Sequence, residues 1–324
     1  MKSYLPFQRT SSRSVLLSLA ASVFLTTPAS AQSLDGFQWP SVSEYERIST
    51  QGKTNWVVDV ENDSLLLKRD DGFYTSGNHL WRQSNLREAS RLTSYRWTLG
   101  QDLYTASDIK IKPNQLSRFD HPYAGWLYFG LSREQQASDG RSYAVGFDLG
   151  CLGPCAGGEW TQTHLHQLLN QPLPQAWNTQ LKQEWGVVAK LSYAATRLAI
   201  SNDADLQVRG AARVGNIFTD VSSDVLLRWG TLNALSTDAA SFWQARVGLR
   251  AVAYNATIQG GYFRRQNLAV SPKRLVPEAE LGYVYQGSQW QFLAAVIRRG
   301  NEIAELKNAE GSQNFAKISL GYSF

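Results

Sequence analysis

Two of the four histidines in this chain, His164 and His166, lie in a segment with helical spacing that runs from Gly158 to Leu169. On a helix, Gln162 and His166 share one face because they are four residues apart, while His164 points elsewhere. Imidazole accepts a proton near neutral pH, so His166 is a candidate general base. A surface histidine without a chemical role is the alternative interpretation. The apolar positions of the predicted helix are Trp160, Leu165, Leu168 and Leu169.

A second group of candidate residues gathers oxygen atoms at one predicted hairpin. Glu61-Asn62-Asp63 ends one strand-like run, and Asp70-Asp71-Gly72-Phe73-Tyr74-Thr75-Ser76-Gly77 leads into the next. Carboxylates and amides gathered across one hairpin suit a hard cation such as Ca²⁺, which prefers several oxygen ligands. A polar hairpin loop with an Asp-Gly turn explains the same residues without a metal.

A third motif, Asp120-His121-Pro122-Tyr123-Ala124-Gly125-Trp126, has the composition of a turn that enters a strand. Pro122 fixes one backbone angle, and Gly125 permits close approach of another backbone segment. Taken alone, this motif indicates a structural turn.

The two cysteines of the chain, Cys151 and Cys155, flank Leu152-Gly153-Pro154. In an oxidising compartment a disulfide that rigidifies this short loop is plausible. Two free thiols, or a metal pair that lacks partner ligands, are the alternatives.

The elements that position these residues are predicted to be strands. Ile318, Leu320, Tyr322 and Phe324 fall on one face of a final strand that ends on an aromatic residue. Bacterial outer-membrane barrels commonly end in this way, because the last strand closes the cylinder against the first. The ending therefore favours a membrane barrel.

The amino-terminal end carries the features of an export signal. Lys2, Arg9 and Arg13 precede an apolar run from Val15 to Leu25, and Ala29-Ser30-Ala31 has the pattern of a cleavage site. We predict that residues 1–31 are a cleaved signal peptide and that residues 32–324 form a single outer-membrane barrel domain. The apolar run is short for a retained membrane helix, which is the alternative.

Alternating apolar and polar residues predict twelve strands, and an even number returns both chain ends to the periplasm. The fold class is all-β, a twelve-stranded antiparallel transmembrane barrel with a short helix in an extracellular loop. Residues 32–53 are a polar lead-in, and residues 257–265 are assigned to an outer loop. Segments 102–124, 150–184 and 254–273 are long connections, whereas 136–140, 201–203 and 286–288 are short turns predicted for the opposite side. The predicted strands lie near Trp56–Leu66, Phe73–Arg82, Ser94–Gln101, Trp126–Ser132, Arg141–Leu149, Trp185–Ala195, Leu206–Val214, Val221–Trp229, Phe242–Ala253, Leu275–Tyr285, Trp290–Arg298 and Ala316–Phe324.

Composition is compatible with this architecture. Eleven Trp and fourteen Tyr suit aromatic girdles at two membrane interfaces, although a large soluble β-sandwich is also rich in aromatic residues. Three basic residues belong to the leader, so the formal charge of +5 is poor evidence for nucleic-acid binding. We expect a monomer with no nucleic-acid partner.

Together and in this order, the motifs resemble those of the outer-membrane lipid A 3′-O-deacylases of the LpxR type. The resemblance rests on Glu61-Asn62-Asp63, Asp71…Tyr74-Thr75-Ser76-Gly77, Asp120-His121-Pro122-Tyr123-Ala124-Gly125-Trp126, Gly153-Pro154…Gly158-Glu159…Gln162…His166, and Trp177-Asn178…Gln180-Leu181…Glu184. Barrel-like sequence follows these motifs. The second position of the turn motif holds His121, where the family more often has Arg.

The resemblance implies an active site between the barrel wall and a loop helix, facing the extracellular side of the outer membrane. The implied reaction is Ca²⁺-dependent hydrolysis of the ester that holds the 3′ acyloxyacyl group of lipid A. His166 would activate the attacking water with the support of Gln162, and the metal would stabilise the oxyanion. The implied metal ligands are Asn62 and Asp63, with Thr75 or Ser76 nearby.

Basic residues near the barrel mouth could receive the phosphates of lipid A, the implied partner together with the outer-membrane bilayer. The candidates are Lys68, Arg69 and Arg118. Two other function classes stay open. One is an outer-membrane phospholipase with a serine nucleophile, for which Ser76 is the variant to test. The other is a non-enzymatic barrel, either a narrow pore or a surface-interaction protein.

Overall fold

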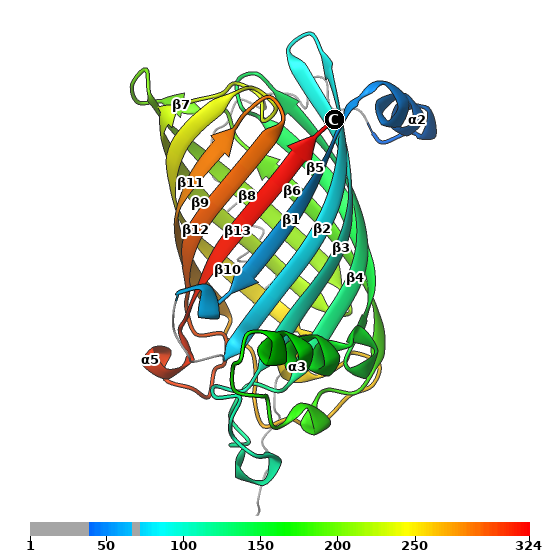
Figure 1. Cartoon of the computed structure of the whole chain (residues 1–324), viewed down its shortest axis with the longest axis vertical. Helices are drawn as coiled ribbons and strands as arrows, with labels where there is room; N and C mark the ends of the chain where they lie inside the picture. Colours follow the sequence, from blue (N-terminus) through cyan, green and yellow to red (C-terminus); the bar gives the residue numbers. More distant parts are fainter. Residues whose placement is uncertain (1–38, 67–71) are drawn as a thin grey trace, which may run out of the picture. The chain divides into compact units, whose positions relative to one another are not determined.

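Twelve antiparallel strands close into one cylinder in the computed structural model, which describes residues 39–66 and 72–324 (Figure 1). Strand β6 pairs with β5 on one side and with β8 on the other, which closes the ring. The two-residue β7 (Leu198–Ala199) pairs with β8 beside that ring. The predicted architecture and all twelve predicted strands are confirmed. The strands of the ring are β1 (Lys53–Asn62), β2 (Phe73–Glu88), β3 (Arg91–Thr105), β4 (Ala124–Ala137), β5 (Ser142–Leu152), β6 (Glu184–Ala194), β8 (Ala204–Gly215), β9 (Phe218–Thr231), β10 (Ala240–Asn255), β11 (Leu275–Gln286), β12 (Trp290–Arg299) and β13 (Gln313–Ser323).

The first and last strands of the ring are hydrogen-bonded to each other, as the aromatic ending of the chain predicts. Strand β1 pairs with β13 from Asn55 opposite Ser323 to Asn62 opposite Ala316. The backbone amide of Phe324 adds a hydrogen bond to the carbonyl of Thr54 at 2.9 Å. Pairing the ends leaves neither strand with an open edge, which in a membrane would be costly.

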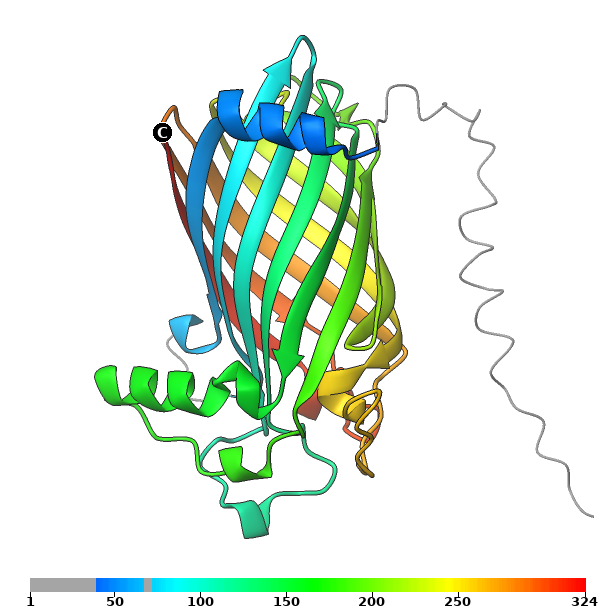
Figure 2. The same ribbon diagram turned by 90° about the vertical axis from the view of Figure 1, so that its right-hand side faces the viewer.

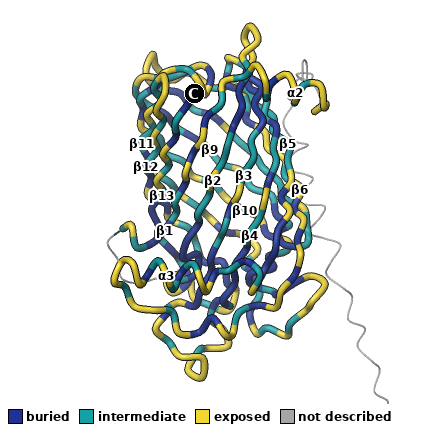
Figure 3. Tube along the Cα trace, turned by 45° about the vertical axis from the view of Figure 1, so that its right-hand side comes forward, coloured by how far each residue is buried: buried dark blue, intermediate teal, exposed yellow. Residues whose placement is uncertain are grey.

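Burial changes from residue to residue along the strands (Figure 3). Alternate residues of each strand face the outside of the cylinder, and along most of the wall these are apolar and exposed. On β1, Trp56 and Val58 are 43% and 52% exposed, and on β13, Ile318 and Leu320 are 40% and 50% exposed. An apolar outer wall with a two-residue period is the pattern of a barrel that contacts lipid.

The inward side chains of the same strands are largely polar and are paired across neighbouring strands. Arg246 on β10, for example, donates to Glu278 and Glu280 of β11 at 2.7 and 2.8 Å. Such pairing satisfies charges that would be costly to bury alone. Further pairs of this kind are Arg209–Asp224, Arg213–Asp220, Arg228–Asp205, Lys190–Asp148, Arg299–Glu278 and Lys317–Glu61.

Toward one end of the cylinder the lumen is filled by a layer of buried apolar side chains. The rings of Tyr74 and Phe315, from strands on either side of β1, meet with centroids 5.2 Å apart. Trp126 and Leu152 are at most 1% exposed on the neighbouring β4 and β5. Side chains can fill the interior of a small barrel, whereas the widest barrels leave an open channel. The layer consists of Tyr74, Tyr104, Ala124, Trp126, Leu152, Leu181, Val188, Ile217, Phe218, Ala256, Ile297 and Phe315.

The two ends of the cylinder differ in the length of their connections (Figure 2). Residues 106–123, 153–183 and 256–274 form long connections at one end, which we call the loop end. Short connections such as 138–141 and 287–289 lie at the opposite end, the turn end, where the chain also terminates. The predicted separation of long loops from short turns is confirmed, and residues 257–265 lie outside the strands, as predicted.

Short helical segments occupy the loops, and the predicted loop helix is confirmed as α3 (Gly158–Leu168). Within the described part of the chain, no helix is long and apolar enough to cross a bilayer. The other helical segments of the loops are α4 (Ala256–Gln259), α5 (Asn308–Gly311), η1 (Ser64–Leu66), η2 (Pro113–Gln115), η3 (Pro154–Ala156) and η4 (Trp177–Thr179).

A helix that the sequence analysis did not predict, α2 (Val42–Gln51), packs on the outer wall at the turn end (Figure 2). Ser41 caps it by accepting a hydrogen bond from the Glu44 amide at 3.1 Å, which satisfies an otherwise unpaired donor. Ile48 is fully buried, and Glu44 accepts two hydrogen bonds from Arg133 of β4. The assignment of residues 32–53 as a polar lead-in is therefore corrected for this stretch. Contacts with distant residues hold this helix on the wall, among them the ion pair between Glu44 and Arg133.

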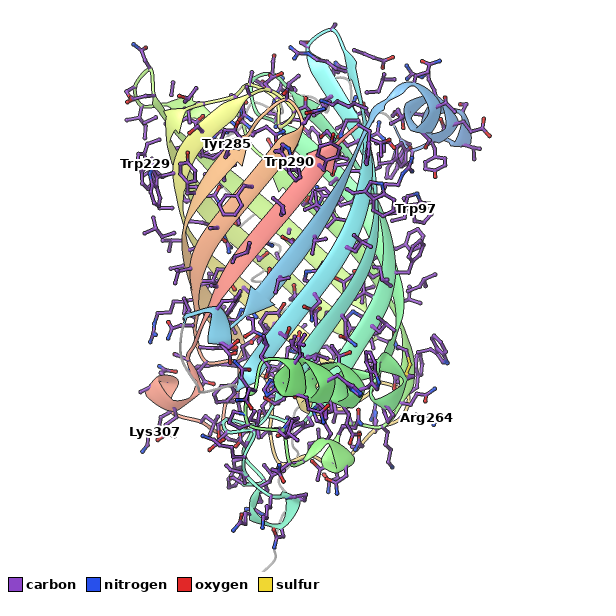
Figure 4. All side chains as sticks on the ribbon, in the orientation of Figure 1. Trp97, Trp229, Arg264, Tyr285, Trp290 and Lys307 are labelled. Atoms are coloured by element: carbon purple, nitrogen blue, oxygen red, sulfur yellow. A yellow bond between two sulfur atoms is a disulfide. The ribbon has the colours of Figure 1, made fainter. Side chains whose placement is uncertain are left out.

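Large aromatic side chains gather on the outer wall near the turn end, where Figure 4 labels Trp97, Trp229, Tyr285 and Trp290. Tyr285 and Trp290 are 46% and 52% exposed. This placement fits the predicted aromatic girdle at one membrane interface. The predicted signal peptide, residues 1–31, lies outside the described residues.

Candidate active site

Helix α3 buries its polar face and exposes its apolar one. Its buried residues are Gly158, Gln162 and His166, which lie one turn apart along one side. Trp160 and Leu168 are 67% and 81% exposed. A surface helix of a soluble protein normally buries its apolar stripe, whereas α3 is inverted and turns that stripe outward, as suits a helix beside lipid on the outer wall of a barrel. The prediction that Gln162 and His166 share a face while His164 points elsewhere is confirmed.

The wall of the barrel fixes where α3 begins. Gln101, which points outward from β3, donates to the Ala156 carbonyl at 2.7 Å and to Thr161 Oγ1 at 3.1 Å. A Cβ atom at Gly125 would come within 2.9 Å of Ala156, so the glycine permits the close approach predicted for it. Cys151 and Cys155 form the predicted disulfide, with Cα atoms 6.0 Å apart, immediately before the helix.

The ring of His166 is oriented by a backbone carbonyl. Its Nδ1 lies 2.6 Å from the carbonyl oxygen of Pro172, and the ring is 4% exposed. A carbonyl oxygen only accepts hydrogen bonds, so Nδ1 carries the proton in the neutral ring and Nε2 holds the lone pair. In that tautomer Nε2 is the ring nitrogen with the capacity to accept a proton. His164, by contrast, is exposed and contacts the Trp160 carbonyl of its own helix.

Gln162 is 2% exposed and is held by the indole of Trp177 in η4. Trp177 Nε1 donates to Gln162 Oε1 at 2.7 Å. Among the residues that the structure describes, Gln162 Nε2 has no hydrogen-bond partner, although it is fully buried. The amide therefore offers two donor hydrogens next to His166.

The polar residues of the first hairpin lie on the outside of the wall, toward α3. Side chains alternate along β1, so Asn62 points outward like Trp56 and Val58. Its partner in the register is Ser76 on β2, which faces the same way. A bulge between Tyr74 and Ser76 inserts Thr75, whose hydroxyl lies 2.6 Å from that of Thr105. Asn62, Thr75 and Ser76 are all buried.

Asp63 follows β1 directly and completes this group. Its Oδ2 accepts a hydrogen bond from the Gly72 amide at 3.1 Å, and the residue is 6% exposed. The neighbouring Asn62 Oδ1 accepts from the amide and the hydroxyl of Ser64 at 2.7 and 2.5 Å. These hydrogen bonds across the loop are what a polar hairpin requires.

The donor atoms of this hairpin suit a hard cation. Within residues 39–66 and 72–324, no group of three or more His, Cys, Asp or Glu side chains is arranged to hold a metal. Ca²⁺ does not need such a group, because it also binds amide, hydroxyl, carbonyl and water oxygens. One buried carboxylate, one amide and two hydroxyls, all oxygen donors, are present at Asp63, Asn62, Thr75 and Ser76.

The hairpin and the helix lie at the same end and on the same side of the cylinder. Figures 1 and 2 both show α3 beside η1 and the loop-end tips of β2 and β3. The predicted site residues thus come together as two groups, Asn62, Asp63, Thr75 and Ser76 on the wall, and Gln162 and His166 on the helix. Both groups lie on the outer face of the barrel, not in its lumen.

The motif around His121 is structural. Asp120 accepts hydrogen bonds from the amide and hydroxyl of Ser107 at 2.9 and 2.7 Å, which ties the ends of the loop together. His121 stacks on Tyr104 with ring centroids 5.4 Å apart. Burial lowers the pKa of His121, against the opposing effect of the Pro122 carbonyl, so this residue is neutral at physiological pH.

The residues predicted to bind phosphate are only partly placed. Arg118 is exposed in the loop between β3 and β4, with its guanidinium 4.6 Å from the ring of Phe119. Lys68 and Arg69 lie outside the described residues. The sequence analysis gave no role to Trp177. A buried tryptophan in a polar loop is the signal that points to a hydrogen-bonded partner.

The fold and sequence were compared with known proteins. A family model described as "Outer membrane protein LpxR" matches residues 17–324. The solved structure of LpxR from Salmonella typhimurium matches with a TM-score of 0.69 and 20% identity, over 83% of this chain and 100% of that chain. No curated protein matches the chain by sequence.

Other matching structures are more distant. The β domain of the Bordetella autotransporter BrkA has a TM-score of 0.43 and 11% identity, over 84% of this chain and 98% of that one. The translocator domain of the autotransporter NalP from Neisseria meningitidis also has a TM-score of 0.43 and 11% identity, over 87% and 94%. The family match covers nearly the whole chain and agrees with the fold. The chain belongs to the LpxR family of outer-membrane barrel proteins.

Proposed function

We propose that this protein is a lipid A 3′-O-deacylase, a carboxylic ester hydrolase that removes the 3′-linked acyloxyacyl group of lipopolysaccharide. The observation that carries the proposal is the inverted helix α3, which holds a base, His166, and an amide, Gln162, against a polar patch on the outer wall. Membership of the LpxR family supports the same conclusion.

The position of the site suits a lipid substrate. Along the outward face of β2 the side chains change from polar Ser76 and Asn78 to apolar Leu80, which is 40% exposed. Leu99 on the neighbouring β3 is 50% exposed on the same outer wall. A molecule with a polar head at the site and acyl chains along these leucines would keep its chains in the bilayer. That geometry favours an amphiphile over a soluble ester.

His166 supplies the proton transfers of the proposed hydrolysis. Its Nε2 takes a proton from a water molecule as the water oxygen attacks the ester carbonyl carbon. The tetrahedral intermediate then breaks the bond to the sugar oxygen, and the imidazolium returns the proton to that leaving oxygen. The Pro172 carbonyl holds the ring in the required tautomer throughout. The products are the free acyloxyacyl carboxylic acid and lipid A with a 3′ hydroxyl on its sugar.

Asn62 and Asp63 would hold Ca²⁺, with Thr75 and Ser76 beside it, and the ion would supply positive charge to the developing oxyanion. The buried oxygen donors of these residues support this assignment. Lys68, Arg69 and Arg118 would bind the phosphates of lipid A. The protein would act as a monomer, with its loop end toward the outside of the cell and residues 1–31 removed on export.

The test is to extract lipid A from cells that express wild type, His166→Ala or His164→Ala, and to compare the species by mass spectrometry. We expect wild type and His164→Ala, whose imidazole is exposed on the same helix, to lose the 3′ acyloxyacyl mass. His166→Ala should leave lipid A intact. Identical spectra from wild type and His166→Ala, both folded as heat-modifiable barrels in calcium, would contradict the proposal.

The same preparations separate the other function classes. A phospholipase with a serine nucleophile needs an imidazole at Ser76, whereas the recorded partner of Ser76 Oγ is the Asn78 amide at 3.0 Å. Release of fatty acid from phospholipid with lipid A unchanged would favour the phospholipase. No hydrolysis of either lipid would favour a non-enzymatic barrel.

A further inference from the structure

The hydrogen bond between Trp177 and Gln162 determines which end of the Gln162 amide faces the site. An indole Nε1 is a donor only, so the amide atom 2.7 Å away must be the oxygen, Oε1. The positions of the oxygen and the nitrogen in the Gln162 amide therefore follow from the donor character of the indole. The NH₂ group of Gln162 must point away from Trp177.

That NH₂ group is buried and unsatisfied. Gln162 is 2% exposed, and within the described residues its Nε2 has no hydrogen-bond partner. An orphaned buried donor is costly, because the group has lost its hydrogen bonds to water and gained none in the protein. Native structures contain few such groups, and a catalytic role is one of the explanations for them. Nε2 lies on the buried face of α3 that also carries His166.

We propose that Trp177 is a positioning residue that locks the Gln162 amide so that Nε2 donates a hydrogen bond to the ester oxygen that becomes negative during hydrolysis. The inference rests on the proposed function, and it deepens it by assigning Gln162 as a second source of oxyanion stabilisation. A preorganised donor aimed at developing charge needs no rearrangement during the reaction.

The surroundings of Trp177 are those of a rigid support. Its side chain is 2% exposed and meets the ring of Tyr123 edge-on, with centroids 5.2 Å apart. It packs in a small apolar cluster with Leu103 of the barrel wall. The indole thus connects the amide to the wall, which carries the rest of the site. An amide without this partner would be free to turn its oxygen toward the substrate.

The first experiment compares kcat and KM of the whole barrel, in detergent with calcium, for Trp177→Phe, Gln162→Met and the double variant. Phenylalanine keeps an aromatic ring and removes the donor, and methionine keeps the length of Gln162 and removes the amide. We expect Gln162→Met to lower kcat about 100-fold and Trp177→Phe to lower it about 10-fold, with little change in KM. Trp185→Phe, at a tryptophan that is 72% exposed on β6, should match wild type.

The double variant distinguishes positioning from structural support. If Trp177 acts through the amide, Trp177→Phe causes no further loss of kcat in the Gln162→Met background. An equal loss in both backgrounds would overturn the inference, because Trp177 would then act independently of Gln162. Wild-type kcat in Trp177→Phe, or a change confined to KM, would overturn it as well.

A second measurement does not depend on activity. In an NMR spectrum of the ¹⁵N-labelled barrel, the indole N–H signal of Trp177 should move upfield in Gln162→Met, which removes the acceptor, and stay at a hydrogen-bonded, downfield position in Gln162→Glu, which keeps one. A signal unchanged by Gln162→Met would overturn the inference even if the enzyme is active. Failure of the proposed function is seen separately, as intact lipid A with the wild-type protein.

Discussion

Glu44 of helix α2 accepts two hydrogen bonds from Arg133 on the outer wall of β4, at 2.8 Å from Nε and 2.7 Å from Nη2. The side chain of Arg133 is only 1% exposed, although the position points away from the lumen. A bare arginine on the lipid-facing side would be costly near the membrane. The helix therefore supplies a carboxylate that pairs with a buried charge of the barrel wall.

The first prediction is that stability falls in acid because of Glu44. Burial raises the pKa of this carboxyl, but the hydrogen bonds from Arg133 and Tyr95 and the charge of Arg133 outweigh that effect and lower it. A lowered folded pKa gives stability that is present above the unfolded pKa and is lost as pH falls through the folded one. Urea unfolding in lipid vesicles between pH 7 and pH 3 measures this loss.

Substitution of the same pair provides the control. Glu44→Gln removes the carboxylate that accepts two hydrogen bonds from the buried Arg133 and should cost about 3 kcal/mol at pH 7. The double variant Glu44→Gln with Arg133→Met should recover much of that loss and abolish its share of the pH dependence. If the double variant is as unstable as Glu44→Gln, the pair is not the reason that α2 docks.

The second prediction concerns the contact between Gly158 and Trp177. A Cβ atom at residue 158 would lie 2.6 Å from the indole and 2.9 Å from Leu103, so Gly158→Ala must displace α3 or Trp177. We expect a destabilisation of about 1–3 kcal/mol at the loop and a lower kcat. Gly210→Ala is the matched control, because its Cβ would meet only ordinary contact at 3.7 Å. Equal activity of the two variants would contradict the packing argument.

The third prediction is a requirement for calcium. Chelation with EDTA should abolish deacylation, and Ca²⁺ should restore it better than Mg²⁺, because flexible loop oxygens suit the larger ion. Asp63→Asn removes the buried carboxylate and should raise the Ca²⁺ concentration needed for half-maximal activity. A metal-independent wild type would remove Asn62 and Asp63 from the proposed chemistry.

The fourth prediction is that the disulfide stabilises the loop rather than the barrel. Cys151 and Cys155 are four residues apart, and closing so short a loop is worth about 2 kcal/mol. Reduction should therefore speed thermal loss of activity while the heat-modifiable barrel persists on gels. The double variant Cys151→Ala with Cys155→Ala should behave like the reduced wild type and should not respond to reductant.

The fifth prediction is that the protein does not conduct ions. Buried Tyr74, Trp126 and Phe315 belong to an apolar layer that fills the lumen toward the loop end. Hydrated ions would have to displace this packed layer. Planar bilayer recordings should show no stable channel. Steady single-channel currents from pure protein would instead revive the pore hypothesis.

The sequence predicts the elements in which the spacing of apolar residues matches the secondary structure. Every strand of the ring was found because alternation reports a wall that is apolar outside and polar inside. Gln162 and His166 were placed on one face of a helix by spacing alone. The sequence does not predict that this face is the buried one. The apolar side chains of Trp160 and Leu168 would be expected to face the protein, yet they are exposed.

The features that the sequence does not predict depend on contacts between residues that are far apart in the chain. Helix α2 has one buried apolar residue, Ile48. Its Glu44 contacts Arg133, which belongs to a strand much later in the sequence. The direction of the Gln162 amide depends on Trp177, in another part of the loop. A local pattern cannot report such pairs, since neither member alone differs from an ordinary surface residue.

The seam between β1 and β13 makes the strand order of this protein circular. Phe324 is hydrogen-bonded beside the start of β1, so the order of strands around the barrel returns to its starting point. Most neighbouring strands of the ring are consecutive in the sequence. The pairing of β1 with β13 instead joins the two ends of the barrel sequence, so it carries the largest entropy cost of loop closure. Adding or removing a whole hairpin elsewhere in the ring would therefore widen or narrow it while the pairing of β1 with β13 stays in place.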